Sequence, residues 1–250
     1  MRRYALRDDQ WDRIKDFLPG REGHVGGTAA DNRLFVEAIL YRYRAGIPWR
    51  DLPERFGDWK IVHQRFSRWA KSGVFERIFK LLASEHDNEY MIIDATIVRA
   101  HQHSAGARKK NGEQAIGRSR GGLTTKIHAL VDALGNPVDV MLTPGQAHDL
   151  ACAEPLLEEA DPEALIGDKA YDADPLLDTL TQREITPVIP PKANRKTPRT
   201  CDFVLYCERN LIERFFNKLK HFRAIATRYD KLARNFLAGV QLACAIILLN

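Results

Sequence analysis

The stretch YMIIDATIVRA, residues 90–100, marks the point at which the chain changes from a helical pattern to a β-rich one. Its apolar and β-branched residues predict a strand. Asp94 stands inside this strand, directly after Met91-Ile92-Ile93. Aspartate is depleted in strands, and a carboxylate beside an apolar run is costly unless it is paired or bound to a metal. Asp94 is therefore either a cap or loop residue or a functional carboxylate.

A second aspartate occurs in the same setting. The segment ALIGDKAY, residues 164–171, predicts a short buried strand that ends at Asp168. Ligand sites in open α/β sheets lie at the carboxyl ends of strands. If the two strands are neighbours, Asp94 and Asp168 meet at one edge, which weakens the interpretation of either as a simple cap. Asp172 and Asp174 lie close enough in sequence to compete for a metal.

The segments around these strands predict a mixed sheet with flanking helices. Residues 101–122 are polar, basic and Gly-rich and predict a flexible loop, whereas two apolar runs around Gly135-Asn136 predict a hairpin. The remaining segments predict helices in residues 149–160, 173–184 and 201–250 and a strand in residues 185–192. This order indicates an α/β sandwich around a mixed sheet, with a hairpin beside parallel strands.

Residues 1–85 have a helical pattern. Asp31 is placed to cap one helix at its N-terminus, and Gly46 is placed to close it. Two short helices around Gly57-Asp58 resemble a helix-turn-helix. The second of them carries Lys60, Arg65 and Arg68. A plain helical bundle is the alternative, because helix-turn-helix geometry leaves only a weak trace in a sequence.

Residues 206–220, YCERNLIERFFNKLK, predict an amphipathic helix. At 100° per residue, Tyr206, Arg209, Glu213 and Lys220 fall within about 60° of one another. A separate apolar face can pack onto the sheet, and it consists of Leu211, Ile212, Phe215, Phe216, Leu219 and Phe222. On spacing alone, Arg209 and Glu213 fit a solvated i,i+4 salt bridge as well as they fit a functional edge.

The spacing Tyr206-x2-Arg209-x3-Glu213-x6-Lys220 resembles the Y-R-E-K signature of bacterial insertion-sequence transposases of the insertion-sequence-five group. Three further segments are similar to that family, so that the likeness covers nearly the whole chain: IIDATIVRAHQHSAGARK, IGDKAYDAD and AGIPWRDLPERFGDWKIVHQRFSRWAKSG. The resemblance implies a DDE enzyme whose RNase H-like catalytic domain spans residues 87–250. It also implies that residues 1–86 form a helical DNA-binding region.

The resemblance further implies that Asp94, Asp168 and Glu213 form the catalytic triad and bind Mg²⁺ or Mn²⁺ as a pair of ions. Carboxylate oxygens suit Mg²⁺, and two ions about 3.5–4 Å apart activate the attacking oxygen and stabilise the leaving one. The expected reactions are metal-dependent cleavage at the ends of the element and transfer of the released 3′-hydroxyl into target DNA.

Charge is distributed unevenly along the chain. Residues 99–126 hold seven Lys or Arg against one acidic residue, residues 192–234 hold twelve against four, and residues 146–184 hold two against eleven. Two basic blocks favour a polyanionic partner. Together with the resemblance, they predict contacts with double-stranded DNA from Tyr206, Arg209, Lys220, Lys169, Lys60, Arg65, Arg68, Lys109 and Lys110.

Composition limits other possibilities. The four cysteines are scattered without a C-x-x-C pair, which argues against a disulfide framework and a zinc site. No apolar run follows Met1, and the most apolar segment, residues 236–250, is too short to cross a bilayer. These features predict a cytoplasmic, nucleoid-associated protein with no membrane partner.

The expected function is a DNA transposase that works as a homodimer or a larger assembly on terminal inverted repeats and target DNA, since two ends must be cut and joined together. Two alternatives stay open. One is a non-catalytic DNA-binding regulator that keeps the core as a scaffold. The other is an RNase H-like structure-specific nuclease that has the same triad and no strand-transfer step.

Overall fold

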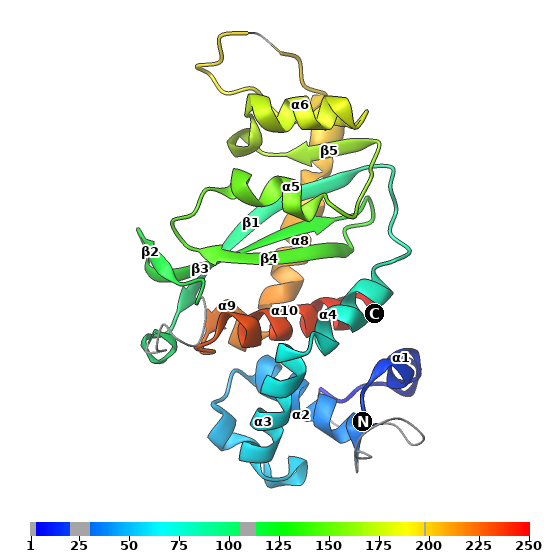
Figure 1. Ribbon diagram of the computed structural model, residues 1–250, viewed down its shortest axis with the longest axis vertical. Helices are drawn as coiled ribbons and strands as arrows, with labels where there is room; N and C mark the ends of the chain where they lie inside the picture. The colour runs from blue at the N-terminus through cyan, green and yellow to red at the C-terminus, as the bar shows by residue number, and fades with distance from the viewer. Residues whose placement is uncertain (1–3, 21–30, 106–113, 198) are drawn as a thin grey trace. The chain divides into compact units, whose positions relative to one another are not determined.

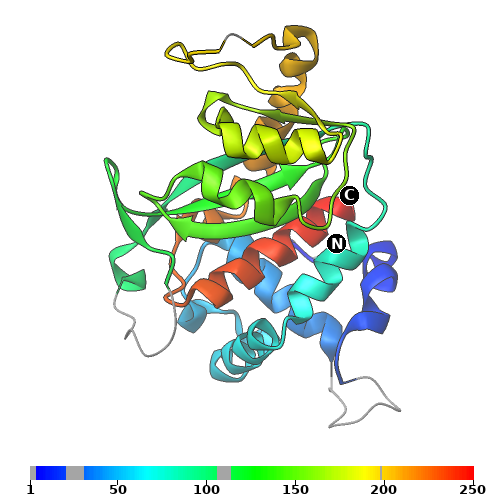
Figure 2. The same cartoon turned by 45° about the horizontal axis from the view of Figure 1, so that its top comes forward.

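The computed structural model describes residues 4–20, 31–105, 114–197 and 199–250 (Figure 1). The chain forms two compact units, whose helices and strands can also be followed from a second direction in Figure 2. Unit 1 comprises Met1–Leu82, Arg99–Gln114 and Leu219–Asn250, and unit 2 comprises Ala83–Val98 and Ala115–Lys218. The helical N-terminal segment therefore shares a unit with the last residues of the chain.

Unit 1 is predominantly helical, as predicted. Asp31 accepts a hydrogen bond from the Leu34 N–H at 2.8 Å and caps α2, and Gly46 ends this helix in the left-handed region at φ 72°. The elements of the unit are α1 (Asp8–Ile14), η1 (Lys15–Phe17), α2 (Asn32–Ala45), η2 (Trp49–Asp51), η3 (Glu54–Phe56), α3 (Trp59–Lys71), α4 (Val74–Leu82), η4 (Gln102–Ser104), α9 (Arg223–Ala226), β7 (Thr227–Arg228) and α10 (Ala233–Leu248).

The segment before Gly57 differs from the expected first helix of a helix-turn-helix. It forms two short 3₁₀ turns, η2 and η3, and each turn follows a proline, Pro48 or Pro53. Proline has no N–H to donate and disfavours helical geometry in the residue before it, so one helix cannot run through Pro53. The short helix expected before Gly57 is therefore present only as two 3₁₀ turns. The helix after Asp58 does form, because the Asp58 side chain caps α3.

Charged residues in the interior of unit 1 are paired. Arg42 donates to Asp230 Oδ2 at 2.9 Å, and the Tyr43 hydroxyl donates to the same oxygen at 3.0 Å. Arg228 is also buried and donates to the backbone carbonyls of Asp230 and Lys231. Because a buried charge is costly unless it is paired, Asp230 is the anion on which this part of the core depends.

Unit 2 contains a mixed sheet, except for β7 and the end of β1, which belong to unit 1. Within the described residues the sheet has seven strands in the order β2-β3-β1-β5-β6, with β4 paired to β3 and β7 paired to the end of β1. β5 is parallel to β1, β6 is parallel to β5, and β3 and β4 are antiparallel. The new bounds are β1 (Met91–Ala100), β2 (Gly117–Ser119), β3 (Gly122–Val131), β4 (Pro137–Pro144), β5 (Ala164–Gly167) and β6 (Thr186–Val188). A hairpin beside parallel strands, in the order β4-β3-β1-β5-β6, confirms the predicted RNase H-like mixed sheet.

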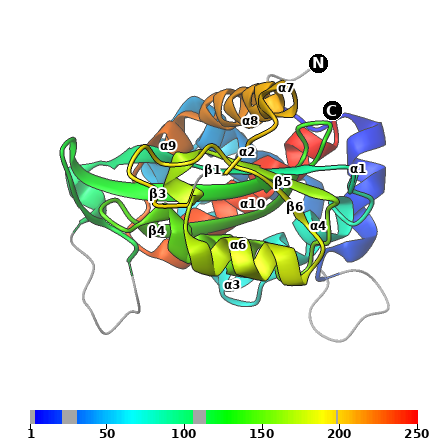
Figure 3. The ribbon, with the colours of Figure 1, turned by 90° about the horizontal axis from the view of Figure 1, so that it is seen from above.

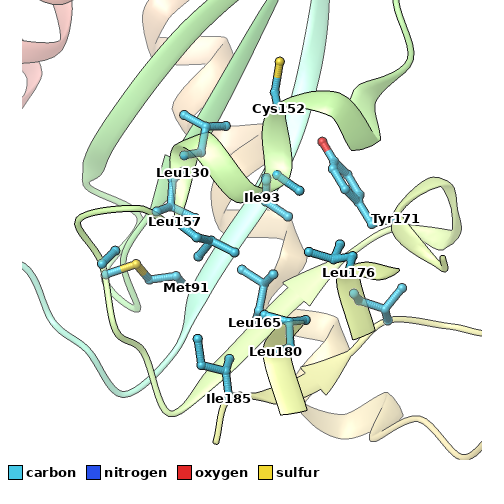
Figure 4. Close-up of a cluster of buried hydrophobic side chains, with 14 of the residues drawn as sticks. Met91, Ile93, Leu130, Cys152, Leu157, Leu165, Tyr171, Leu176, Leu180 and Ile185 are labelled. Carbon is cyan, nitrogen blue, oxygen red and sulfur yellow. The ribbon is translucent and has the colours of Figure 1, made fainter. Parts of the chain in front are cut away.

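Helices flank both faces of this sheet. Figure 3 shows the sheet edge-on, with α6 (Asp174–Gln182) on one side and α7 (Phe203–Tyr206) and α8 (Asn210–Lys220) on the other. The α6 side holds a large apolar cluster, in which Met91, Ile93 and Leu165 pack with residues of α5 (Ala153–Leu156) and α6 (Figure 4). Because side chains alternate along a strand, Ile92 and Asp94 of β1 and Ile166 of β5 point toward the α8 side.

Local chemistry explains where the predicted elements shift. The predicted hairpin forms, and Gly135 takes φ 77° in its turn. The strand β2 was expected to be loop, and its three residues are too few to show a periodic pattern. The helix expected in residues 149–160 shortens to η6 (Asp149–Cys152) and α5, because Pro155 is tolerated only in the first turn of an α-helix. In the described ranges no helix has the length and apolar character needed to cross a membrane.

His128 on β3 is a titratable group in the interior of unit 2. Its ring is fully buried, and its Nε2 atom lies 2.7 Å from Thr143 Oγ1 on β4. Burial lowers the pKa of His128 to about 4, while Asp149 acts to raise it and Lys126 to lower it. The neutral imidazole is therefore the native form near neutral pH.

We expect acid to destabilise the fold through His128. In the unfolded chain a histidine protonates near pH 6.5, so the contribution of His128 is fully present above that pH and is lost as the pH falls toward 4. The loss amounts to about 3 kcal/mol. Urea denaturation between pH 7 and 4.5 measures it, and the His128→Gln variant should lose less free energy of unfolding over this range. The matched control is His148→Gln, and equal acid losses in all three proteins would contradict the prediction.

Candidate active site

Asp94 lies in β1, and Asp168 directly follows β5, the parallel neighbour of β1 in unit 2. The strands pair in the register Met91↔Leu165, Ile92↔Ile166 and Ile93↔Gly167. Asp94 follows Ile93 and Asp168 follows Gly167, so the two aspartates come directly after the last of these pairs. Neighbouring strands are about 4.8 Å apart. The structure therefore brings together two residues that are far apart in the sequence.

Both aspartates face the α8 side of the sheet. Ile93 and Leu165 belong to the apolar cluster on the opposite side, and the alternation of side chains directs Asp94 and Asp168 away from it. Asp168 also caps the turn η7 (Lys169–Tyr171), since its Oδ1 accepts the Ala170 N–H at 2.7 Å. The cap and the candidate ligand are thus the same residue, and the cap hydrogen bond fixes the direction of its carboxylate.

The third carboxylate, Glu213, is linked to Asp94 by hydrogen bonds from one arginine, Arg209. Arg209 lies in η8 (Cys207–Arg209), which follows α7 and precedes α8. Its Nη1 atom donates to Glu213 Oε1 at 2.8 Å, and its Nη2 atom donates to Asp94 Oδ2 at 2.7 Å. The i,i+4 pair predicted from spacing forms, and the same guanidinium also reaches across to the sheet. The two carboxylate oxygens therefore lie within about 8 Å of each other.

Burial sets the electrostatics of the site. It raises the pKa of Asp94, and the charge of Asp168 acts in the same direction, while the Ala95 N–H and Arg209 oppose it. Burial acts to lower the pKa of Arg209, but Asp94, Tyr206 and Glu213 outweigh it and leave that pKa raised. The guanidinium consequently remains positively charged among these carboxylates.

Two tyrosines lie near the charges of the site. Burial raises the pKa of Tyr206, with Arg209 opposing the change and Asp168 and Asp94 adding to it. Burial likewise raises the pKa of Tyr171, helped by the charges of Asp149, Asp94 and Asp168. Both phenols therefore stay protonated at neutral pH. Tyr206 is half-buried and accessible to a ligand, whereas Tyr171 is buried in the apolar cluster.

The donor set of the site suits a hard divalent cation. Asp94, Asp168 and Glu213 all belong to unit 2, and carboxylate oxygens are the ligands that Mg²⁺ and Mn²⁺ favour. In the described ranges, however, no three His, Cys, Asp or Glu side chains are already grouped so as to hold a metal ion. Arg209 stands between two of the three carboxylates. The residues fit the cation in chemistry.

The remaining residues predicted to contact DNA lie in different parts of the chain. Lys169 is exposed in η7, directly after Asp168, and Lys220 is the last residue of α8 and belongs to unit 1. Lys60 and Arg68 are exposed on α3, whereas the Arg65 guanidinium packs 4.2 Å from the centre of the Phe35 ring and donates to Asn32. Lys109 and Lys110 lie outside the described residues.

Asp172 has a role that the sequence did not indicate. It is buried and accepts hydrogen bonds from the Lys192 N–H at 2.8 Å, from Arg195 Nη1 at 2.8 Å and from Arg199 Nη2 at 3.2 Å. Asp172 thereby ties the basic segment 192–199 to the turn that follows Asp168. Residues 192–199 have no periodic pattern, so nothing in the sequence could reveal this contact.

Two family models match the chain. The model of the transposase DDE domain matches residues 85–248, and a model of IS4/5-family transposases (DUF4096) matches residues 6–79. Together they cover both the helical N-terminal segment and the part that carries Asp94, Asp168 and Glu213.

Individual proteins are also similar to the chain. Protein y4sN of Sinorhizobium fredii (strain NBRC 101917 / NGR234) is 51% identical over 108 residues, which are 43% of this chain and 86% of that protein. A protein of Brucella ovis (strain ATCC 25840 / 63/290 / NCTC 10512), named as a transposase for insertion sequence element IS6501, is 43% identical over 130 residues, which are 51% of this chain and 100% of that protein. Among solved structures, the piggyBac transposase synaptic complex with hairpin DNA aligns with 76% of this chain and 48% of its own, at 14% identity and a TM-score of 0.43.

Proposed function

Because this chain belongs to the transposase DDE domain family, which its residues 85–248 match, we propose that Asp94, Asp168 and Glu213 are the catalytic carboxylates of a DNA transposase. One observation supports this assignment above the others. Asp94 and Asp168 meet on neighbouring strands, and a single guanidinium joins Glu213 to Asp94. The family generally uses divalent metals, and these three side chains would hold two Mg²⁺ or Mn²⁺ ions.

The bound ions would polarise the scissile phosphodiester and activate the attacking oxygen. The fold of the protein determines where the carboxylates and Arg209 lie. The pairing of β1 with β5 positions Asp94 and Asp168, and the run from α7 through α8 presents Arg209 and Glu213 to them. Water first cuts the end of the element and leaves a 3′-hydroxyl, which then attacks target DNA, so that no covalent protein nucleophile is needed. Arg209 can hold a phosphate through two parallel hydrogen bonds.

DNA would contact basic residues in both units. On α3, Lys60, Gln64, Arg68 and Lys71 are exposed at helical spacing and form one polar stripe, which is suited to the backbone and grooves of duplex DNA. Arg65 would contribute less to this surface, because its guanidinium is already engaged by Phe35 and Asn32.

Tyr206 and Lys169 would contact the strand beside the scissile bond. Lys109, Lys110 and Lys220 are assigned to DNA contact from the family signature and the basic blocks alone.

The division of labour would follow the sequence, with residues 1–86 recognising DNA and residues 87–250 cutting it. The active assembly would be at least a homodimer, because two ends of one element must be processed together. The substrates would be the terminal inverted repeats and target DNA, which implies action at the bacterial nucleoid in the cytoplasm.

The proposed function is tested with the purified chain, a duplex that carries the end of the element, and Mg²⁺ or Mn²⁺. We expect nicking at the end, complete inhibition by a chelator, and joining of a pre-cleaved 3′ end to plasmid DNA. Nicking without joining would favour the structure-specific nuclease. DNA binding with neither reaction would favour the non-catalytic regulator.

A further inference from the structure

Arg209 takes a position between the proposed ligands that helix spacing alone does not require. The pair with Glu213 follows from i,i+4 geometry. The pair with Asp94 joins residues 115 positions apart and depends on how the run from η8 to α8 packs against the sheet. One guanidinium therefore uses both of its terminal nitrogens on carboxylates of the proposed triad.

Both oxygens of Asp94 are engaged while this contact persists. Its Oδ1 accepts the Ala95 N–H at 2.7 Å, and its Oδ2 accepts Arg209 Nη2 at 2.7 Å. The Asp94 side chain is only 16% exposed, so its charge needs a positive partner close by. In the geometry seen here, that partner is Arg209.

With the proposed role of the triad as its premise, we propose that Arg209 is a stand-in cation, which holds Asp94 and Glu213 before metal binds and releases both when metal and DNA arrive. A divalent ion on the same oxygens repels a guanidinium and takes its hydrogen-bond acceptors. The two terminal nitrogens of the released guanidinium then match a DNA phosphate, which accepts two parallel hydrogen bonds from arginine.

The change that this exchange needs is local. Arg209 Nε is buried and makes no hydrogen bond in the described structure, so only the two terminal nitrogens must change partners. Because a phosphate stabilises the released guanidinium, metal and DNA must each increase the affinity for the other. Metal would therefore bind weakly to the protein alone and more tightly to its complex with DNA.

The test measures Mn²⁺ binding to the DNA-free full chain by isothermal titration calorimetry. In Arg209→Gln the competing cation is gone, and the dissociation constant for Mn²⁺ should fall about tenfold, as expected for the loss of one or two partly exposed salt bridges. DNA-end binding by the same variant should weaken. A purely structural role of Arg209 would not produce these opposite changes. Arg209→Lys retains the charge but offers one nitrogen in place of the two terminal nitrogens of arginine, so it should give a smaller gain. Circular dichroism shows that each variant is folded.

Arg195→Gln is the matched control. Arg195 also bridges two carboxylates of unit 2, Asp172 and Asp174, and its removal should leave the Mn²⁺ affinity unchanged. Asp94→Asn should abolish Mn²⁺ binding, both in the wild-type chain and in Arg209→Gln. If Mn²⁺ binds to wild type and Arg209→Gln equally, with loss in Asp94→Asn, the exchange is refuted and the proposed function stands. If no Mn²⁺ binding depends on Asp94 in any variant, the exchange is refuted, and the cleavage assay with DNA and metal decides the proposed function separately.

Discussion

Replacement of Glu213 by Gln should reduce cleavage of the element's end by about a thousandfold or more, while DNA-end binding changes by less than about twofold. The amide has nearly the shape of the carboxylate but lacks its charge, so the proposed metal ligand is lost and the packing of α8 is kept. Glu213 is the most exposed of the three carboxylates, at 58%, so the substitution should not unfold the chain. Cleavage under single-turnover conditions in Mn²⁺, beside a fluorescence binding assay without metal, measures the two effects.

Glu208→Gln is the control for this variant, because it makes the same change in η8, one residue before Arg209. It should cleave at close to the wild-type rate. The assignment of Glu213 as a metal ligand fails if Glu213→Gln cleaves within about tenfold of wild type. It also fails if the variant loses DNA binding as severely as cleavage, since Glu213 would then act on the complex rather than on the chemical step.

The two aspartates show how much of the site can be predicted from sequence. An apolar run that ends in Asp predicts a strand end, and two such runs predicted that Asp94 and Asp168 would meet. The structure places Asp94 in β1 and Asp168 directly after β5, each one residue beyond the pair Ile93↔Gly167. The 100° step of a helix left Glu213 open between a solvated salt bridge and a functional edge, and only the resemblance to the transposase family assigned it to the triad. The bridge from Arg209 to Asp94 could not be foreseen, because it depends on the packing of the segment that carries Arg209 against the sheet, which leaves no periodic trace in either segment.

The other differences between the sequence-based predictions and the structure also have physical explanations. Proline chemistry decides the 3₁₀ turns before Gly57, and in principle Pro53 in the sequence signalled it. The contacts of Asp172 with the segment 192–199 and the pairing of β2 are non-local, and no window of sequence contains both partners. Local pattern thus predicts elements and their faces, whereas single side-chain contacts between distant segments require the folded chain.

Replacement of Asp230 by Ala should destabilise the protein by about 3–5 kcal/mol, which is the usual cost of leaving one partner of a buried ion pair without its counter-charge. Arg42 and Asp230 have side chains that are only 2% and 4% exposed, and the Tyr43 hydroxyl donates to the same carboxylate. The charge of Asp230 also supports the buried Arg228, whose pKa burial lowers to about 10. Such a loss is a large part of the stability of an ordinary domain. Urea denaturation followed by circular dichroism measures the change.

Two comparisons separate the buried charge from a general effect of substitution. Asp9→Ala removes the exposed pair of Asp9 and Arg7, whose side chains are 65% and 42% exposed, and should leave the free energy of unfolding close to that of wild type. The double variant Arg42→Met with Asp230→Leu removes both charges and replaces them with apolar groups, so it should recover much of the stability lost in Asp230→Ala. If the double variant is no more stable than Asp230→Ala, the cost arises from packing rather than from an unpaired guanidinium. If Asp230→Ala lies within about 1 kcal/mol of wild type, the core of unit 1 does not depend on this anion.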